Sequence, residues 1–192
     1  MNIQEYAPLA LRTAKRMPTV YMDRWHAAVG MITELGELAD AYKRHEIYGK
    51  PLDSANALEE AGDFCWYLIL HMSLTGVHLD KLAGEGDKNR QFLVPSEAHR
   101  YLLCLTACAT TFMISTGALN DEDYASMNQQ LCGEALFAIG RLAELNGSSL
   151  GQVLQTNIDK LALRYGDKYS DYKALNRDVA AERVVLDGSS NS

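Results

Sequence analysis

Acidic side chains form two closely spaced pairs in the first third of this 192-residue sequence. Glu34 and Glu37 are three residues apart, and Glu60 and Asp63 repeat the same spacing. Residues three apart lie on one face of an α-helix, one turn from each other. Both pairs stand in apolar sequence, where four carboxylates would repel one another unless a cation compensated their charge. The pattern therefore predicts a site for a divalent cation.

Oxygen ligands of this kind suit Mg²⁺, with Mn²⁺ as a second option, and both ions keep coordination positions open for water and phosphate oxygens. The sequence contains no Glu-x-x-His tetrapeptide of the type that di-iron helical bundles use. Gly36 and Gly62 lie inside the two acidic pairs, and each costs about 1 kcal/mol in a helix interior. Close helix approach beside the metal is expected at both. The alternative is that the acids are capping, surface or ion-paired groups, as most glutamates on helices are.

Apolar residues recur at three- and four-residue spacing between only four prolines, which predicts an all-α fold. The expected helices run over about Tyr21–His45, from Asp53 or Ser54 to Gly76, His78–Gly84, Glu97–Ser115, Asp123–Leu145 and Ser149–Tyr165. The second of these is nearly all apolar after Asp63 and should lie at the centre of the bundle. Residues 84–90 form the expected boundary, and the tail from Ala180 to Ser192 is expected to be loose.

A weak internal repeat suggests how the chain is organised. Residues 62–82 align without gaps on residues 133–153, and two glycines match in each copy. Two buried helices could also look alike by chance. The repeat favours a pseudo-dimer of two degenerate, fused repeats, with residues 1–90 carrying the metal site, 91–170 forming the second helical repeat and 171–192 forming a C-terminal tail.

Bulk properties narrow the function classes. The net charge of −7 argues against duplex nucleic acid or an anionic membrane as the main partner, but it leaves a small anionic ligand open. The four cysteines form no C-x-x-C pair, which favours reduced core thiols. The N-terminal residues lack the apolar block of a signal peptide, and no apolar run of about 18 residues occurs. We therefore expect a cytoplasmic protein.

The acidic motifs resemble those of a known family. The stretch ELGELAD contains Glu34 and Glu37, EEAGDFCWYL contains Glu60 and Asp63, and 22 residues separate Glu37 from Glu60. This arrangement resembles the MazG-like all-α nucleoside triphosphate pyrophosphohydrolases, a superfamily that includes dimeric dUTPases. The resemblance covers about residues 1–82 and returns at NIDKLALRYG. It implies a MazG-like bundle that cleaves between the α- and β-phosphates, giving a nucleoside monophosphate and pyrophosphate.

The resemblance also implies residue roles. The four acids become metal ligands and catalytic residues, and one of them, or Glu59 beside them, would orient the attacking water. Asn157, Lys160 and Arg164 match the family's closing element and would contact the phosphates. Shifted by the repeat, the four acidic positions fall on Leu105, Cys108, Leu131 and Glu134. The second half should therefore bind no metal and instead supply the closing element to the first.

Further residues have two interpretations each. Lys43 could reach the phosphates or simply complement the end of its helix. Trp66 and Tyr67 could line a base pocket or pack in the core, and His26 and His71 are expected to be hydrogen-bonded core residues.

The function also has alternatives. One is a dUTPase-like or other specialised nucleotide pyrophosphatase, and another is a non-catalytic helical module that binds nucleotides or a protein. The sequence contains no G-x-x-x-x-G-K-[ST] phosphate loop. By analogy to phage relatives, dGTP and dATP are the first substrates to test, and a homodimer is expected.

Overall fold

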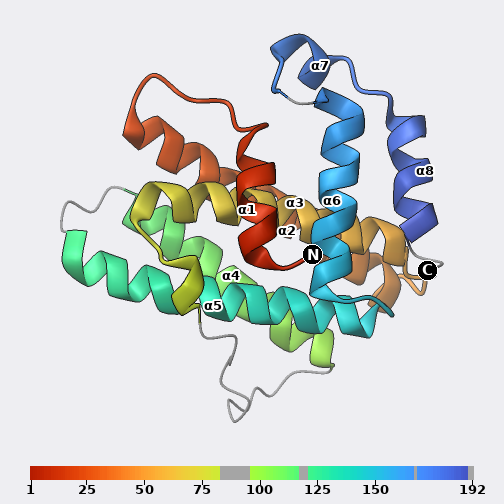
Figure 1. Cartoon of the computed structure of the whole chain (residues 1–192). Helices are drawn as coiled ribbons and strands as arrows, with labels where there is room; N and C mark the ends of the chain where they lie inside the picture. Colours follow the sequence, from red (N-terminus) through yellow and green to blue (C-terminus); the bar gives the residue numbers. More distant parts are fainter. Residues whose placement is uncertain (83–95, 117–120, 167, 190–192) are drawn as a thin grey trace.

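The computed structural model describes residues 1–82, 96–116, 121–166 and 168–189, leaving out the side chains of residues 121–125 and 189. Every regular element in these ranges is a helix, which confirms the all-α prediction (Figure 1). The elements are α1 (Ile3–Leu11), α2 (Val20–Glu46), α3 (Ser54–Thr75), the 3₁₀ turn η1 (Leu79–Lys81), α4 (Glu97–Ser115), α5 (Asp121–Leu145), α6 (Leu150–Tyr165), α7 (Asp171–Leu175) and α8 (Val179–Ser189).

Residues of the types that commonly cap helices lie at the start of α2 and at both ends of α3. Thr19 caps α2 by accepting a hydrogen bond from the amide of Met22, and Asp53 caps α3 in the same way from Asn56. Gly76 ends α3 at a φ of +69°, a left-handed conformation that glycine adopts without strain. Caps at both ends therefore fix where α3, the helix that carries Glu60 and Asp63, starts and stops.

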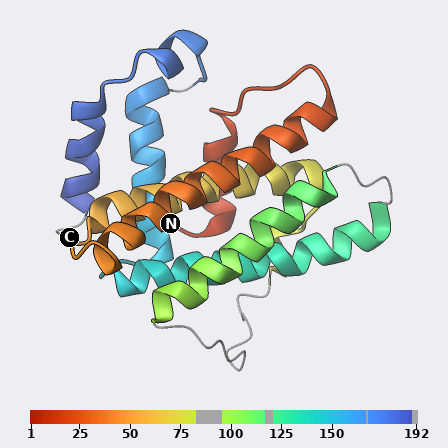
Figure 2. The same ribbon diagram turned by 180° about the vertical axis from the view of Figure 1, so that it is seen from behind.

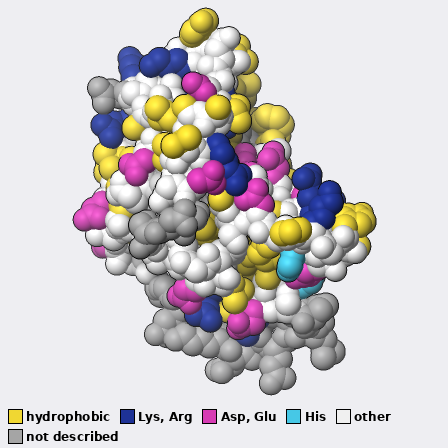
Figure 3. Space-filling view, turned by 90° about the vertical axis from the view of Figure 1, so that its right-hand side faces the viewer, with side chains coloured by type: hydrophobic (Ala, Val, Ile, Leu, Met, Phe, Trp, Pro, Cys, Tyr) yellow, Lys and Arg dark blue, Asp and Glu magenta, His cyan; other side chains and the backbone are white. Residues whose placement is uncertain are grey.

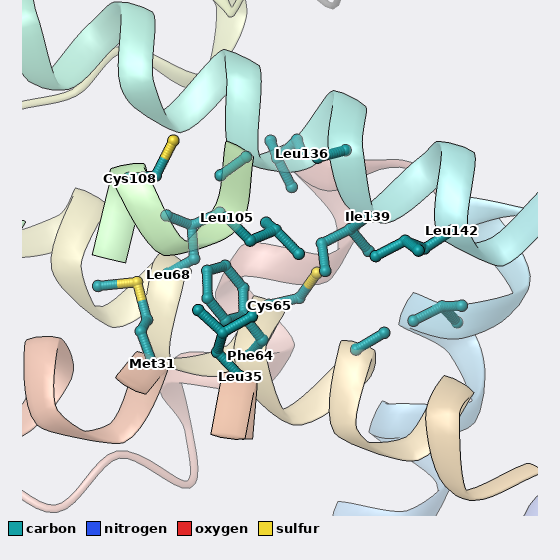
Figure 4. Packing of buried hydrophobic residues seen from close by; sticks show 14 of the residues in the cluster. Met31, Leu35, Phe64, Cys65, Leu68, Leu105, Cys108, Leu136, Ile139 and Leu142 are labelled. Atoms are coloured by element: carbon teal, nitrogen blue, oxygen red, sulfur yellow. The ribbon is translucent and has the colours of Figure 1, made fainter. Parts of the chain in front are cut away.

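Two antiparallel helix pairs build the body of the molecule. Helix α2 lies along α3 and α4 lies along α5 in both views of the ribbon (Figures 1 and 2). Their inner faces share one core, in which Phe64 and Leu68 of α3 meet Leu105 of α4 and Ile139 of α5 (Figure 4). These four side chains are fully buried, so α3 is the central helix, as predicted. All four cysteines are free thiols, also as predicted.

Helices α1, α6 and α8 close one side of this body. Helices α1 and α6 pack against α3, and α8 runs beside α6 (Figure 1). The prediction that the chain is loose from Ala180 was wrong, since α8 continues to Ser189. Glu182 and Leu186 are buried, and these contacts stabilise a helix that its weakly apolar sequence does not indicate.

The connecting segments differ from expectation in two places. A helix was expected from His78 to Gly84, but a single 3₁₀ turn spans Leu79–Lys81. The expected boundary at residues 84–90 lies outside the described residues. Helix α7 was not predicted; it has five residues, too few for a period to be visible in the sequence.

The internal repeat matches at one turn and departs after it. Gly76 and Gly147 form one of the two aligned glycine pairs, and both take positive φ just beyond the ends of α3 and α5. The segments that follow are different, because Gly76 leads to the short turn η1 while Gly147 leads to the 16-residue helix α6. The two halves therefore differ beyond the turns that follow α3 and α5.

The described surface has mixed charge. On the face seen in Figure 3, Asp and Glu side chains lie next to Lys and Arg side chains, and no large area of a single sign forms there. None of the described helices combines the length and apolar character needed to cross a membrane.

Candidate metal and phosphate site

Three of the four predicted acids converge. Glu34 on α2 and both Glu60 and Asp63 on α3 each offer one carboxylate oxygen, and these oxygens lie within 4.8 Å of one another. Spacing within α3 places Glu60 and Asp63 on one face, and packing of α2 along α3 adds Glu34 from the other side. Glu37 is exposed and lines the same cleft, but it lies outside this group of three.

The negative charges of these three carboxylates repel one another, and the group is partly buried. Burial, together with the charges of Asp63 and Glu37, raises the pKa of Glu34 to about 7. Burial and the same two neighbours raise the pKa of Glu60 to about 9. Both shifts mean that a proton or another cation is favoured between these oxygens. An all-oxygen, partly buried donor set with unbalanced negative charge fits Mg²⁺ or Mn²⁺.

Asp63 is held from the far side by α6. Asn157 donates from Nδ2 to Oδ1 of Asp63 at 2.7 Å, and the ammonium of Lys160 lies 2.5 Å from Oδ2. Tyr6 of α1 donates its hydroxyl to Oδ1 of Asn157 at 2.7 Å, which fixes the orientation of the amide. Each carboxylate oxygen of Asp63 therefore has one fixed partner and a further lone pair for a ligand in the cleft.

The position of Lys160 differs from the role that the resemblance implied. Its side chain is 1% exposed and contacts Asp63 and Glu59, and it is not among the residues that line the cleft. Burial lowers the pKa of Lys160, but the facing charges of Asp63 and Glu59 outweigh this, so the pKa is raised and the ammonium stays charged. Asn157 likewise reaches Asp63 rather than the cleft. Both residues position the carboxylate instead of facing a phosphate.

The two glycines inside the acidic pairs differ. A Cβ at Gly62 would lie 3.1 Å from Cβ of Asn157, so the absence of a side chain lets α6 approach α3 beside Asp63. A Cβ at Gly36 would have no atom within 4 Å, apart from the helix itself. The expectation of close helix approach was therefore wrong for Gly36.

The acids line a cleft of about 600 Å³. Small-molecule sites are commonly of roughly 300 to 1,000 Å³, so a nucleotide is of suitable size. Three aromatic rings stand at its wall: Tyr67 and Trp66 pack edge to face at 4.8 Å between centroids, and His26 meets Tyr67 at 5.5 Å. All three residues are half-buried, and Trp66 and Tyr67 also pack against the core.

The aromatic wall depends on a glycine in α2. A Cβ at Gly30 would lie 2.2 Å from the ring atoms Cδ1 and Cε1 of Tyr67, closer than any real contact. Only glycine therefore permits the observed position of this ring. Trp66 is fixed separately, because its indole nitrogen donates to the carbonyl of Ala10 and to Thr13 at 3.0 Å each.

Basic side chains lie in the same cleft. Arg164 on α6 lines the cleft, as the sequence suggested, and its guanidinium donates through Nε and Nη2 to both carboxylate oxygens of Glu182 at 2.7 and 2.6 Å. Arg177 lines the cleft and donates to the same carboxylate at 2.7 Å. Sequence reasoning missed Arg177 and Glu182, since they follow the last recognisable motif and no spacing connects them to it.

Lys43 does not reach the cleft. Its ammonium pairs with Asp40 one turn earlier on α2, and it is absent from the residues that line the cleft. Arg44 pairs with the same carboxylate at 2.5 Å. The position fits the helix-end interpretation of Lys43.

Comparisons with known proteins found no relative. No family model, curated protein or solved structure matches the chain. What the site does is therefore inferred from its own residues.

Two other features in the described part of the chain could attract ligands. A cavity of about 820 Å³ beside α1, α4 and α5 has a mixed lining, with apolar residues such as Leu136 and Phe137 next to charged ones such as Arg100 and Arg141, and it contains no group of metal-ligating side chains among the described residues. Cys104, Cys108 and Glu134 bring one ligand atom each within 4.8 Å of one another. A hydrogen bond with Cys104 and burial raise the pKa of Cys108, which favours the neutral thiol over the thiolate that binds metals.

Proposed function

We propose that this protein hydrolyses (deoxy)nucleoside triphosphates to a nucleoside monophosphate and pyrophosphate in a reaction that depends on Mg²⁺. The observation that carries the proposal is the group formed by Glu34, Glu60 and Asp63 at the wall of a cleft that also contains arginine side chains. Carboxylates suit the metal and guanidinium groups suit phosphate oxygens. The aromatic wall supplies faces on which a base can stack.

The chain's own residues divide the work. Asn157 and Lys160 hold Asp63 in one orientation, so its ligand oxygens need no reorganisation when a substrate enters. Glu59 is tied to Lys160 at 3.1 Å, whereas Glu37 faces the cleft outside the group of three. Glu37 is therefore the carboxylate best placed to orient water. Mg²⁺, when bound, supplies neutralisation of phosphate charge and a lower pKa for coordinated water.

The reaction breaks one bond and forms one. Water oxygen adds to the α-phosphorus, the bond from that phosphorus to the bridging oxygen breaks, and pyrophosphate leaves with that oxygen. The proton released by the water passes to a carboxylate of the cleft, for which Glu37 is suited, and then to solvent. Arginine side chains steady the negative charge of the leaving group.

The fold family is part of the same proposal. We propose a MazG-like bundle in which α2 and α3 carry the metal site and α6 closes it, with the two helix pairs related as degenerate repeats. The matching positive-φ turns at Gly76 and Gly147 support the repeat. A homodimer and a preference for dGTP or dATP belong to the same proposal.

The experiment is a panel of dNTPs and NTPs incubated with the protein and Mg²⁺, with phosphorus NMR to identify the products. We expect monophosphate and pyrophosphate, and in heavy-oxygen water the label should appear in the monophosphate. Asp63→Asn should lower the rate by about a hundredfold or more. Asp159→Asn, an exposed aspartate on α6, is the matched control and should change nothing. No pyrophosphate from any triphosphate would favour a binding module.

A further inference from the structure

The C-terminal segment reaches back to the cleft. Residues 168–189 follow the last motif recognised in the sequence, yet Tyr169, Ala174, Arg177 and Val179 all line the cleft beside the carboxylates. In Figure 1 this segment runs over the end of α6 as α7 and then descends beside α6 as α8.

Three ion pairs attach this segment to different elements. Asp171 pairs with Lys15 of the loop between α1 and α2 at 2.5 Å, and Glu182 pairs with Arg164 of α6 at 2.6 Å. Farther along α8, Arg183 pairs with Asp53, the N-cap of α3, at 3.1 Å. The attachments lie on three separate elements, so the position of Arg177 between α7 and α8 is determined from both sides.

Glu182 joins two arginines into one unit. Its side chain is 4% exposed, and both its oxygens accept from Arg164 while Oε2 also accepts from Arg177. Burial raises the pKa of Glu182, but the hydrogen bonds from the two guanidinium groups outweigh it and bring the pKa to about 2. The two guanidinium groups carry two positive charges and the carboxylate carries one negative charge, so the unit keeps one net positive charge.

Of the two guanidinium groups, that of Arg177 is the more accessible to a ligand. Arg164 uses its Nε and Nη2 edge for Glu182, is 12% exposed, and also lies beside Tyr165, with 5.7 Å from the guanidinium carbon to the ring centroid. Arg177 uses Nη2 alone toward Glu182, and its side chain is 41% exposed within the lining of the cleft. Planar guanidinium groups that remain charged at all physiological pH values bind phosphate oxygens well.

We infer that Arg177 and Arg164 form a polyphosphate-binding subsite in this cleft, with Glu182 as the positioning residue that holds both. The inference rests on the proposed function in one respect, which is that the ligand is the phosphate chain of a nucleoside triphosphate. It adds a binding residue and a positioning residue that lie outside every motif of the sequence. The segment 168–189 is then part of the substrate site rather than a tail.

The test compares Arg177→Ala, Arg177→Lys and the control Arg141→Ala. Arg141 lies on α5, pairs with one glutamate as Arg177 does, is exposed to a similar degree (37% against 41%), and is not among the residues that line the cleft. We expect Arg177→Ala to raise KM for the triphosphate about tenfold, with a smaller fall in kcat, because one charged contact is lost. Arg177→Lys should show a smaller increase in KM, and Arg141→Ala should leave KM unchanged. An equal KM for wild type and Arg177→Ala overturns the subsite.

Glu182→Gln tests the positioning role. It removes the charge that holds both arginines while keeping the shape of the side chain, so KM should rise although both cations remain. A lower KM would show that Glu182 competes with phosphate, which overturns its positioning role. Circular dichroism and thermal unfolding identify any loss of the fold, in which case the Arg177 variants decide the subsite.

A binding measurement separates this inference from the proposed function. Calorimetry with inorganic tripolyphosphate and Mg²⁺ requires no turnover, and we expect wild type to bind about tenfold more tightly than Arg177→Ala. If no triphosphate is hydrolysed but this difference appears, the proposed function fails and the subsite stands. If hydrolysis occurs and both proteins bind tripolyphosphate equally, the subsite fails and the function stands.

Discussion

The ammonium of Lys160 lies 2.5 Å from Oδ2 of Asp63, on the side of that carboxylate that faces α6. The ion pair is buried, with the lysine side chain 1% exposed. Removing one partner of such a pair leaves an uncompensated charge, which commonly costs about 3 to 5 kcal/mol. We therefore expect Lys160→Met to lower the free energy of unfolding by this amount in metal-free buffer, as measured by urea denaturation.

A matched control exists on α2. Lys43 pairs with Asp40 on the surface of the helix, and Lys43→Met should change the free energy of unfolding by less than about 1 kcal/mol. Combining Lys160→Met with Asp63→Asn should recover part of the lost stability, because the neutral amide needs no cation. If the double variant is as unstable as the sum of both single variants, the pair is not the source of the effect.

The sequence was sufficient to predict the five longest helices, α2 to α6, and insufficient to predict α1, α7 and α8. Helix α4 has the predicted bounds Glu97–Ser115 because its apolar spacing and its Ser96 cap are both local signals. Helix α8 was missed because the burial of Glu182 depends on Arg164, which lies 18 residues earlier on another helix. No local pattern encodes such a contact.

The candidate site was likewise predictable from the sequence only in part. Spacing was enough to predict that Glu60 and Asp63 share a helix face, since that follows from the helix period alone. The direction of Lys160 was not predictable, because a lysine one turn from Arg164 could face the cleft or α3. Packing of α6 against α3 decides this, and Gly62 permits the close approach.

The position of Tyr67 gives a second prediction. Gly30→Ala would place a Cβ 2.2 Å from the ring, and the ring is enclosed by His26 and Trp66 and cannot move without disturbing them. Overpacking of this kind costs about 1 to 3 kcal/mol, which exceeds the gain of about 1 kcal/mol from replacing a helical glycine. We expect net destabilisation, measured by thermal or urea unfolding.

Gly36→Ala is the matched substitution on the same helix. Nothing lies within 4 Å of the new Cβ, so the variant should be more stable by roughly 0.5 to 1 kcal/mol. Adding Tyr67→Leu to Gly30→Ala removes the ring atoms in the way and should recover stability. Equal effects of the two alanine substitutions would contradict the close approach of Tyr67 to α2.

His71 gives a prediction about pH. Its ring is fully buried on α3, its Nε2 lies 3.3 Å from Oδ1 of Asn128, and its centroid lies 4.4 Å from that of the Phe112 ring, with the two rings tilted by 40°. Burial lowers the pKa of His71 from 6.5 to about 4; the hydrogen bond with Asn128 opposes this shift, and the charge of Arg24 adds to it. Between these two values the unfolded chain binds a proton that the folded chain does not. Stability from this group is therefore constant above pH 6.5 and falls as the pH drops toward 4.

The comparison of wild type with His71→Gln isolates this contribution, since both chains share every other titrating group. Urea unfolding at pH 7.5, 6 and 5 should show wild type losing about 2 kcal/mol more than the variant by pH 5. Parallel pH profiles would mean that His71 keeps an ordinary pKa in the folded state.

The last prediction concerns Glu60 and has opposite signs with and without metal. Glu60 is buried beside Glu34 and Asp63. Its pKa is raised to about 9, mostly by burial and further by the negative charges of its acidic neighbours. In metal-free buffer at pH 7 the folded protein must bind a proton there that the unfolded chain does not hold. Glu60→Gln removes this cost, so we expect the metal-free variant to be more stable by about 1 to 3 kcal/mol.

With Mg²⁺ bound, wild type should become more stable than Glu60→Gln, because the carboxylate of Glu60 then has a cation as its partner and the amide of the variant does not. A metal at a hundred times its Kd stabilises a folded protein by about 2.7 kcal/mol, so Mg²⁺ should raise the Tm of wild type but not that of Glu60→Gln. Glu144→Gln is the control: an exposed acid remote from the cleft, its substitution should leave both the metal-free stability and the response to Mg²⁺ within about 0.5 kcal/mol of wild type. An equal Mg²⁺ response in wild type and Glu60→Gln would remove Glu60 from the metal site, whereas a wild-type Tm that Mg²⁺ and Mn²⁺ leave unchanged would argue against the site as a whole.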